Sequence, residues 1–280
     1  YSLETEEDNR KALDYYLQYI EYNPKDTDTL LHIGLIYESG LGVPLNIDLA
    51  RRYYERAAEQ DETGMAYNFL GGTYMNDEET ESNERKAVHY FQKAIELGNT
   101  NAMFRISYYL HNGKGGLQVD IPREIELLTE ASKRGNHQAT YRLGLLFEDN
   151  ESGMAQNLEL SVKYFQLAAD NGILAAINKM GELYLFGEVI PANLTKAISC
   201  FTAASEQGYG KASYWLGRLH TDGIGQLEKD TQKAMNYYRK AIEQGYEEAR
   251  EWMEQLQKNL VDETITDIEI PQDKSDEELY

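Results

Sequence analysis

Residues 66–74 read Ala66-Tyr-Asn-Phe-Leu-Gly-Gly-Thr-Tyr74, and variants of this stretch occur six times along the chain. The shared template is Ala-x-x-x-Leu-Gly-x-x-Tyr, and its glycine position recurs every 36 or 37 residues. A period of this length is typical of a protein built from stacked structural repeats. The six residues at the glycine position are Gly34, Gly71, Ser107, Gly144, Gly181 and Gly217.

A second pattern follows each copy of the first. Both patterns place apolar residues three or four positions apart, which predicts amphipathic helices. Glycine closes five copies of the second pattern, where a left-handed cap would end a helix. Each repeat is therefore predicted to be a hairpin of two helices. The second pattern reads Ala-x-x-Tyr-Tyr/Phe-x-x-Ala-Ala and begins at Ala12, Ala50, Ala87, Glu124, Ser161, Ala197 and Ala234.

The alternating patterns, with Gly40-Leu-Gly42-Val43 and Gly223-Ile-Gly225 between the two helices, resemble Sel1-like repeats, relatives of the tetratricopeptide repeat. The resemblance covers residues 10–256. It implies an all-α fold, an α-α superhelix that forms a right-handed solenoid. Copies two and four lack the glycines between their helices, at residues 76–84 and 149–153, so the family's loop geometry is not expected there.

Glycine inside a helix costs about 1 kcal/mol relative to alanine, and the chain places it at five of the six positions. We expect these small residues to let neighbouring helix backbones approach closely. The wider spaces are then expected to be filled by Tyr37, Tyr74, Phe147 and Tyr184.

The repeat array predicts 14 helices, because a lone helix over Lys11–Tyr22 precedes six hairpins and a polar-backed cap helix follows them. An acidic tail, expected to be disordered, comes last. It could instead add a strand to a partner's sheet or compete with a partner for a basic groove. The repeats are predicted near 26–62, 63–99, 100–136, 137–172, 173–209 and 210–246, the cap at 247–260 and the tail at 261–280.

Composition excludes several classes of function. The chain has 280 residues and a net charge of -21, which would repel the phosphates that a nucleic-acid-binding protein must neutralise. No apolar run approaches the 18 or so residues of a membrane-spanning helix. A single cysteine, Cys200, rules out intramolecular disulfides and cysteine-built metal sites.

Side chains that could carry chemistry show no catalytic pattern. Cys200 and His220 occupy aromatic positions of their repeats, where a packed and unreactive side chain is expected. The other histidines lack the spacing of a metal site. Residues 113–116 lack the phosphate-loop pattern, and residues 77–84 lack that of an EF-hand. We therefore predict no catalytic residues, no metal and no cofactor.

The surface of the first helices is the remaining candidate, because these helices line the concave side of a hairpin solenoid. Three consecutive repeats carry a cation at one position, namely Arg105, Arg142 and Lys179, and aromatic residues flank them. Such a groove would suit an acidic peptide or a terminal carboxylate. Alternatively, the cations may serve only to pair with neighbouring acids. The predicted protein-binding residues are Phe69, Phe104, Arg105, Tyr108, Tyr141, Arg142, Lys179, Tyr214, Trp215 and Arg218.

The sequence thus predicts a non-enzymatic scaffold or adaptor that binds a protein or peptide segment, for which an acidic segment is one candidate, and that binds neither nucleic acid nor the membrane interior. Two alternatives stay open from the resemblance: a regulatory subunit that activates a membrane-bound synthase or secretion machine, and a hydrolase related to β-lactamases. The hydrolase is disfavoured because such relatives carry a disulfide in each repeat. The chain starts without methionine, so a signal peptide could have been removed; a cytoplasmic location or the host cytosol is slightly favoured.

Overall fold

The computed structural model describes residues 3–149, 156–224 and 227–266. Within these ranges all regular elements are α-helices, and their number matches the predicted 14. The chain therefore has the all-α fold that the two patterns predict. The helices are α1 Leu3–Tyr22, α2 Thr27–Ser39, α3 Ile47–Ala58, α4 Met65–Met75, α5 Glu81–Glu96, α6 Thr100–Asn112, α7 Ile121–Lys133, α8 His137–Glu148, α9 Leu158–Asp170, α10 Leu174–Phe186, α11 Leu194–Glu206, α12 Gly210–Asp222, α13 Thr231–Glu243 and α14 Ala249–Thr266.

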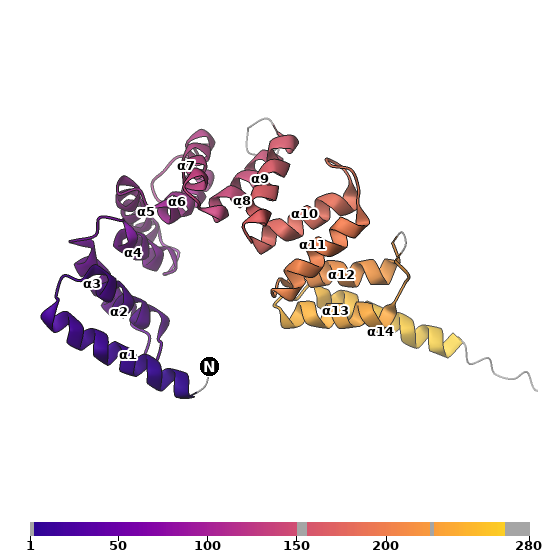
Figure 1. Ribbon diagram of the computed structural model, residues 1–280, viewed down its shortest axis with the longest axis horizontal. Helices are drawn as coiled ribbons and strands as arrows, with labels where there is room; N and C mark the ends of the chain where they lie inside the picture. Colours follow the sequence, from indigo (N-terminus) through magenta and orange to yellow (C-terminus); the bar gives the residue numbers. More distant parts are fainter. Residues whose placement is uncertain (1–2, 150–155, 225–226, 267–280) are drawn as a thin grey trace, which may run out of the picture. The chain divides into compact units, whose positions relative to one another are not determined.

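The helices belong to two compact units, Tyr1–Asn157 and Leu158–Tyr280, called unit 1 and unit 2 below. Within each unit every helix packs against the next one in the chain. In unit 1 the first helices α2, α4 and α6 lie on one side, and the second helices α3, α5 and α7 lie on the other (Figure 1). Side chains from successive first helices can therefore share a surface.

Each hairpin closes through the residue that caps its second helix. The backbone N–H of Asn46 donates to the carbonyl of Tyr37 at 2.8 Å, and that of Asn193 donates to Tyr184 at 2.8 Å. In the second repeat the N–H of Thr80 donates instead to Glu78 within the loop, so this loop does depart from the common geometry. The unusual loop of the fourth repeat lies largely at residues 150–155, outside the described residues.

In four of the repeats the glycine position of the first helix receives an aromatic ring from its own hairpin. A Cβ placed at Gly34 would lie 2.3 Å from the Tyr54 ring, and one at Gly181 would lie 2.6 Å from the Phe201 ring. Gly71 and Gly217 face Phe91 and Tyr238 in the same way. The glycine therefore leaves a notch that an aromatic side chain fills. The expected close approach of two helix backbones is not observed there.

The residues expected to fill the wider spaces lie beside this notch. Tyr37 stacks on Tyr53 and Tyr74 stacks on Tyr90, with ring centroids 5.9 and 5.7 Å apart. These tyrosine pairs lie on the outside of the hairpin, next to the buried ring that packs on the glycine. Tyr37 and Tyr184 are partly buried and pack against the core clusters, while the fully buried ring at the glycine comes from the fifth residue of the second pattern.

Both ends of the repeat array are longer than predicted. Helix α1 begins at Leu3, not Lys11, and its added turns meet the first hairpin, where Arg10 Nε donates to the carbonyl of Gly42 at 3.2 Å. Helix α14 continues to Thr266, six residues beyond the expected boundary at 260. Neither glycine nor proline interrupts the sequence between Gly245 and Pro271, so nothing stops the helix earlier. Residues 267–280 lie outside the described ranges.

In unit 1, asparagine caps connect consecutive repeats. Asn136 Oδ1 accepts the N–H of Ala139 at 2.9 Å, while its Nδ2 donates to the carbonyl of Thr100, one repeat earlier, at 3.1 Å. Asn99 makes the equivalent pair of bonds with Ala102 and Thr63. The caps of α6 and α8 are thus each held by the repeat before them.

Replacing Asn136 with alanine should lower the free energy of unfolding by about 2 kcal/mol, because the cap and the bridge are both lost. Asn193 caps α11 through Lys196 alone, so Asn193→Ala is the matched control and should cost about 1 kcal/mol. Urea denaturation followed by circular dichroism measures both. Equal losses for the two variants would show that the bridge to Thr100 adds nothing.

Candidate functional site

The ten residues predicted to bind a partner fall into two groups, one in each unit. Helices α4, α6 and α8 of unit 1 carry six of them, and helices α10 and α12 of unit 2 carry Lys179, Tyr214, Trp215 and Arg218. The six in unit 1 are Phe69, Phe104, Arg105, Tyr108, Tyr141 and Arg142.

A cavity of about 740 Å³ lies on the first helices of unit 1. Four of the predicted residues line it, while Phe69 and Tyr141 do not; Phe69 instead stacks on Tyr54. Although the chain holds 48 acidic residues, the described residues around this cavity include no carboxylate. The cavity is therefore a locally basic and aromatic place on an acidic protein. Its lining is Met75, Asn101, Phe104, Arg105, Ser107, Tyr108, His111, Asn112, Gln138 and Arg142.

Behind the cavity wall lies Glu124, a buried acid that the sequence analysis did not select. It is 0% exposed and stands where most copies of the second pattern have alanine. Arg142 donates to Oε1 from Nε at 3.1 Å and from Nη2 at 3.0 Å. His111 Nδ1 lies 3.0 Å from Oε2. Glu124 therefore holds two cavity residues in place. Arg142 is already engaged in an ion pair, so its first role is to neutralise Glu124 and not to bind a ligand.

Arg105 differs from the other predicted cations. Its guanidinium lies over α4, where a Cβ at Gly72 would be 3.3 Å from Nη1. Across the parts of the chain that the structure describes, Arg105 has no acidic partner and donates no hydrogen bond. The side chain is half-buried in the cavity wall, between Phe104 and Tyr108 in the lining. It is available to a ligand without breaking an existing ion pair.

In unit 2 the predicted cations pair with acids. Glu182 Oε1 accepts from Lys211 Nζ at 2.7 Å and from Trp215 Nε1 at 2.9 Å, and its Oε2 lies 3.9 Å from Lys179 Nζ. Burial disfavours the charge of Lys211, but the hydrogen bond to Glu182 together with the attraction of Glu182 and nearby tyrosines raises the pKa of Lys211 overall. This network anchors α10 to α12.

Arg218 is held in a similar way. Its Nη1 donates to the Tyr214 hydroxyl at 3.0 Å, its Nη2 lies 3.4 Å from Asp222, and its guanidinium stacks 3.8 Å from the Trp252 ring centre. Pairing with neighbouring side chains thus accounts for Arg142, Lys179 and Arg218. The structure narrows the predicted surface to the unit 1 cavity, with Arg105 as its free cation among the described residues.

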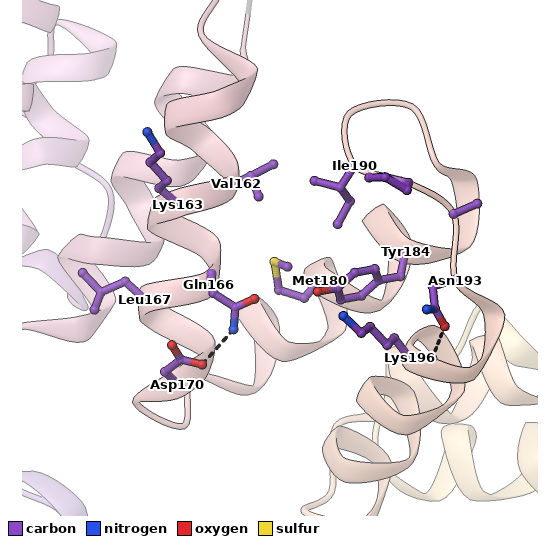
Figure 2. Close-up of a pocket in the computed structure, with 12 residues that line it drawn as sticks. Val162, Lys163, Gln166, Leu167, Asp170, Met180, Tyr184, Ile190, Asn193 and Lys196 are labelled. Atoms are coloured by element: carbon purple, nitrogen blue, oxygen red, sulfur yellow. Dashed lines mark hydrogen bonds between the residues drawn. The ribbon is translucent and has the colours of Figure 1, made fainter.

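A second cavity, of about 620 Å³, lies in unit 2 and was not expected from the sequence (Figure 2). Its walls come from the second helix α9 on one side and from residues 190–193 of the loop before α11, with Lys196 of α11, on the other; Met180 and Tyr184 of α10 lie between them. The sequence analysis considered only the first helices as a binding surface, so it missed this place.

The side chains considered for chemistry are packed. His220 stacks on Tyr237 with ring centroids 5.6 Å apart, and burial lowers its pKa. Burial raises the pKa of the half-buried Cys200 thiol, which favours its neutral form. Over the described ranges, no three His, Cys, Asp or Glu side chains gather as metal ligands would, and no helix has the length and apolar character to cross a bilayer.

Comparison with protein families matches the chain to the Sel1 repeat. The matched segments are 1–18, 28–62, 64–99, 100–136, 137–173, 174–209 and 210–246, which cover most of the sequence. Six of them agree with the predicted repeat boundaries to within about two residues, and 1–18 overlaps the lone first helix.

Similar proteins carry the same repeat. The chain is 33% identical over 78 residues to the Sel1-repeat-containing protein YjcO of Escherichia coli K12, which is 27% of this chain and 34% of that protein. It is 40% identical over 70 residues to protein sel-1 homolog 2 of Rattus norvegicus, which is 25% of this chain and 10% of the rat protein. The chain therefore spans only a third or less of these relatives.

Solved structures show the same fold. A Sel1 repeat protein from Oxalobacter formigenes superposes with a TM-score of 0.74 at 22% identity, covering 85% of this chain and 99% of that one. A protective antigen of uropathogenic Escherichia coli superposes with a TM-score of 0.53 at 22% identity, covering 87% and 59%.

Proposed function

Because the chain belongs to the Sel1-repeat family, whose solenoid is a protein-interaction fold, we propose that it is an adaptor that binds an acidic protein segment in the unit 1 cavity. The observation that carries this proposal is Arg105, a half-buried cation with no acid to pair with across the described residues. A repeat surface that binds a partner needs no catalytic group, and the matched family is a repeat family rather than a family of enzymes.

The cavity supports an acidic ligand through both charge and shape. The guanidinium of Arg105 can donate two parallel hydrogen bonds to one carboxylate, a geometry that lysine cannot offer. Phe104 and the 42% exposed Tyr108 stand beside it and provide flat apolar area at low entropic cost. The described lining itself holds no carboxylate, so the charged groups that an anionic segment would meet directly in the cavity are cationic.

Replacing Arg105 with alanine should weaken binding of an acidic peptide about 10- to 100-fold, because hydrogen bonds to a charged group contribute about 1.5–3 kcal/mol. The probe is a fluorescein-labelled peptide of alternating glutamate and phenylalanine, with a glutamine-for-glutamate peptide as the uncharged comparison. Fluorescence anisotropy at low salt gives both affinities.

Two further variants make the measurement specific. Arg105→Lys keeps the positive charge but loses the two parallel N–H donors of the guanidinium, so it should recover only part of the affinity. Arg85→Ala removes an exposed arginine on α5 that pairs with Glu81 away from the cavity, and it should leave the affinity within twofold. If Arg105→Ala and Arg85→Ala behave alike, or if the uncharged peptide binds equally well, the cavity is not an acidic-peptide site.

A further inference from the structure

The unit 2 cavity is a groove between α9 on one side and the loop before α11 with the first turn of α11 on the other. Figure 2 shows Val162 and Gln166 of α9 turned toward Ile190, Asn193 and Lys196 on the opposite wall, while Lys163 and Leu167 lie at the outer edge of α9. Met180 and Tyr184 of α10 lie between the walls. Helix α9 packs on α10 and α10 packs on α11, so unit 2 alone builds the whole groove. This groove is separate from the cavity of unit 1 assigned above.

The groove follows from the repeat itself, because an equivalent one occurs in unit 1. There a cavity of about 370 Å³ is lined by residues of α5, α6 and α7 at matching positions of the two patterns. Gln92 corresponds to Gln166, Leu110 to Tyr184, and Arg123 to Lys196. Stacked hairpins thus leave a furrow between neighbouring second helices, and the side chains of each repeat decide its size and charge.

The two equivalent furrows differ in their charges. In the smaller one Arg123 is bound by Glu126 of the same helix. In the larger one, Lys163 and Lys196 have no acidic partner across residues 156–224 or elsewhere in the described chain. The carboxylate that shares the lining, Asp170, accepts a hydrogen bond from Gln166 at 2.7 Å. Two cations therefore remain available to a ligand.

The apolar part of the groove is also open. Leu167 is 47% exposed on the α9 wall, and Ile190 faces the space from the loop before α11 (Figure 2). Lys196 lies over the Tyr184 ring, with its Nζ 5.1 Å from the ring centre, which directs the ammonium along the groove. A volume of about 620 Å³ is enough for a few side chains of an extended peptide.

We propose that this groove is a second binding site, and that it takes a short segment of a partner protein in which bulky aliphatic side chains alternate with carboxylates. The aliphatic side chains would pack on Leu167, Ile190 and Met180, and the carboxylates would pair with Lys163 and Lys196. Charge complementarity chooses this occupant over a second copy of the chain, because two chains with a net charge of -21 each repel one another.

The test measures binding of a labelled peptide, acetyl-Asp-Leu-Glu-Leu-Asp-amide, to the full chain by fluorescence anisotropy. The variant K163M/K196M keeps the aliphatic stems and removes both charges, and it should weaken binding about tenfold. The matched control K25M/K133M removes two exposed lysines of unit 1 and should change the affinity by less than twofold. Equal effects of the two double variants would overturn the proposal.

An apolar pair of variants tests the other half of the site. L167S should weaken binding about fivefold, whereas L97S, at a leucine that is 40% exposed in unit 1, should have no effect. Both leucines are substantially exposed, so both variants should fold. Unchanged affinity in L167S would exclude the groove as the peptide's location.

Two last measurements identify the occupant and separate this site from the one in unit 1. Residues 267–270 of the chain read Asp-Ile-Glu-Ile and match the required pattern. The variant I268D/I270D should bind the probe as the parent chain does; a gain of several-fold would make the chain's own segment the occupant and overturn the assignment to a partner. Because the unit 1 cavity is itself proposed to take acidic segments, K163M/K196M and K25M/K133M are also compared in the Arg105→Ala background, where the binding that remains should fall about tenfold with K163M/K196M alone. No remaining binding in that background would show that the probe binds in unit 1 instead.

Discussion

Replacing Arg142 with alanine should lower the free energy of unfolding by about 3–5 kcal/mol, because it removes one partner of a buried ion pair. Glu124 is fully buried and receives two N–H groups of Arg142 on one oxygen. Without them its charge keeps only His111 as a neighbour. Urea denaturation followed by circular dichroism gives the change, and the thermal midpoint should fall with it.

The double variant E124A/R142A should be much less destabilised than R142A alone. Alanine is the residue that the second pattern has at this position, and Ala50, Ala87, Ala197 and Ala234 are all fully buried there. The pair can therefore be replaced together by what the fold already accepts. A double variant as unstable as R142A would show that Arg142 stabilises the protein through contacts other than Glu124.

This expectation also bears on how binding experiments are designed. A loss of ligand affinity in R142A could come from destabilisation of the fold or from loss of the arginine in the cavity lining, and the measurement would not separate the two. E124A/R142A, if folded, separates the two because the acid no longer needs a partner. Arg105 needs no such correction, since no described residue depends on it for an ion pair.

Replacing Phe201 with alanine should lower the free energy of unfolding by about 3–5 kcal/mol, the usual cost of removing a fully buried ring. Phe201 is 0% exposed and its ring fills the notch above Gly181. Phe186, which is 57% exposed, is the matched control, and Phe186→Ala should cost less than about 1 kcal/mol. Urea denaturation measures both, and comparable losses would mean that the notch and its ring are not a unit of stability.

The same contact can be tested by changing the glycine instead of the ring. A Cβ at Gly181 would lie 2.6 Å from the Phe201 ring, so Gly181→Ala should destabilise the protein although alanine favours helix. The third repeat shows the remedy, since it has Ser107 at the glycine position and Leu128 at the ring position. Adding Phe201→Leu to Gly181→Ala should therefore recover part of the loss, and a purely additive double variant would contradict this pairing.

The helices and repeat boundaries could be predicted because both depend on local spacing. Gly34 and Gly181 identify first helices even when the aromatic ring that packs on them is not known. The partner itself could not be read from the pattern, because adjacent aromatics such as Tyr53 and Tyr54 look alike in sequence and only the rotation of the helix separates them. The added turns of α1 and α14 could not be predicted, because residues 3–10 and 261–266 match neither repeat pattern.

The candidate site was predictable only in part. The pattern placed Arg105 and Arg142 on successive first helices, and both do line one cavity. Whether a cation is free depends on acids that come from other helices, as Glu124 does for Arg142. Glu124 did leave a signal in the sequence, because it is a charged residue at a position where the other copies carry alanine or serine.

The asparagine caps of unit 1 give the array a direction. Asn99 and Asn136 each reach back to a carbonyl made one repeat earlier, and neither reaches forward in this way. During synthesis, the carbonyl that the asparagine binds has therefore already left the ribosome when the asparagine emerges. A repeat made earlier does not need a group from a later repeat for its own cap. Assembly of unit 1 should accordingly proceed with translation, from the amino end onward, without waiting for the rest of the chain.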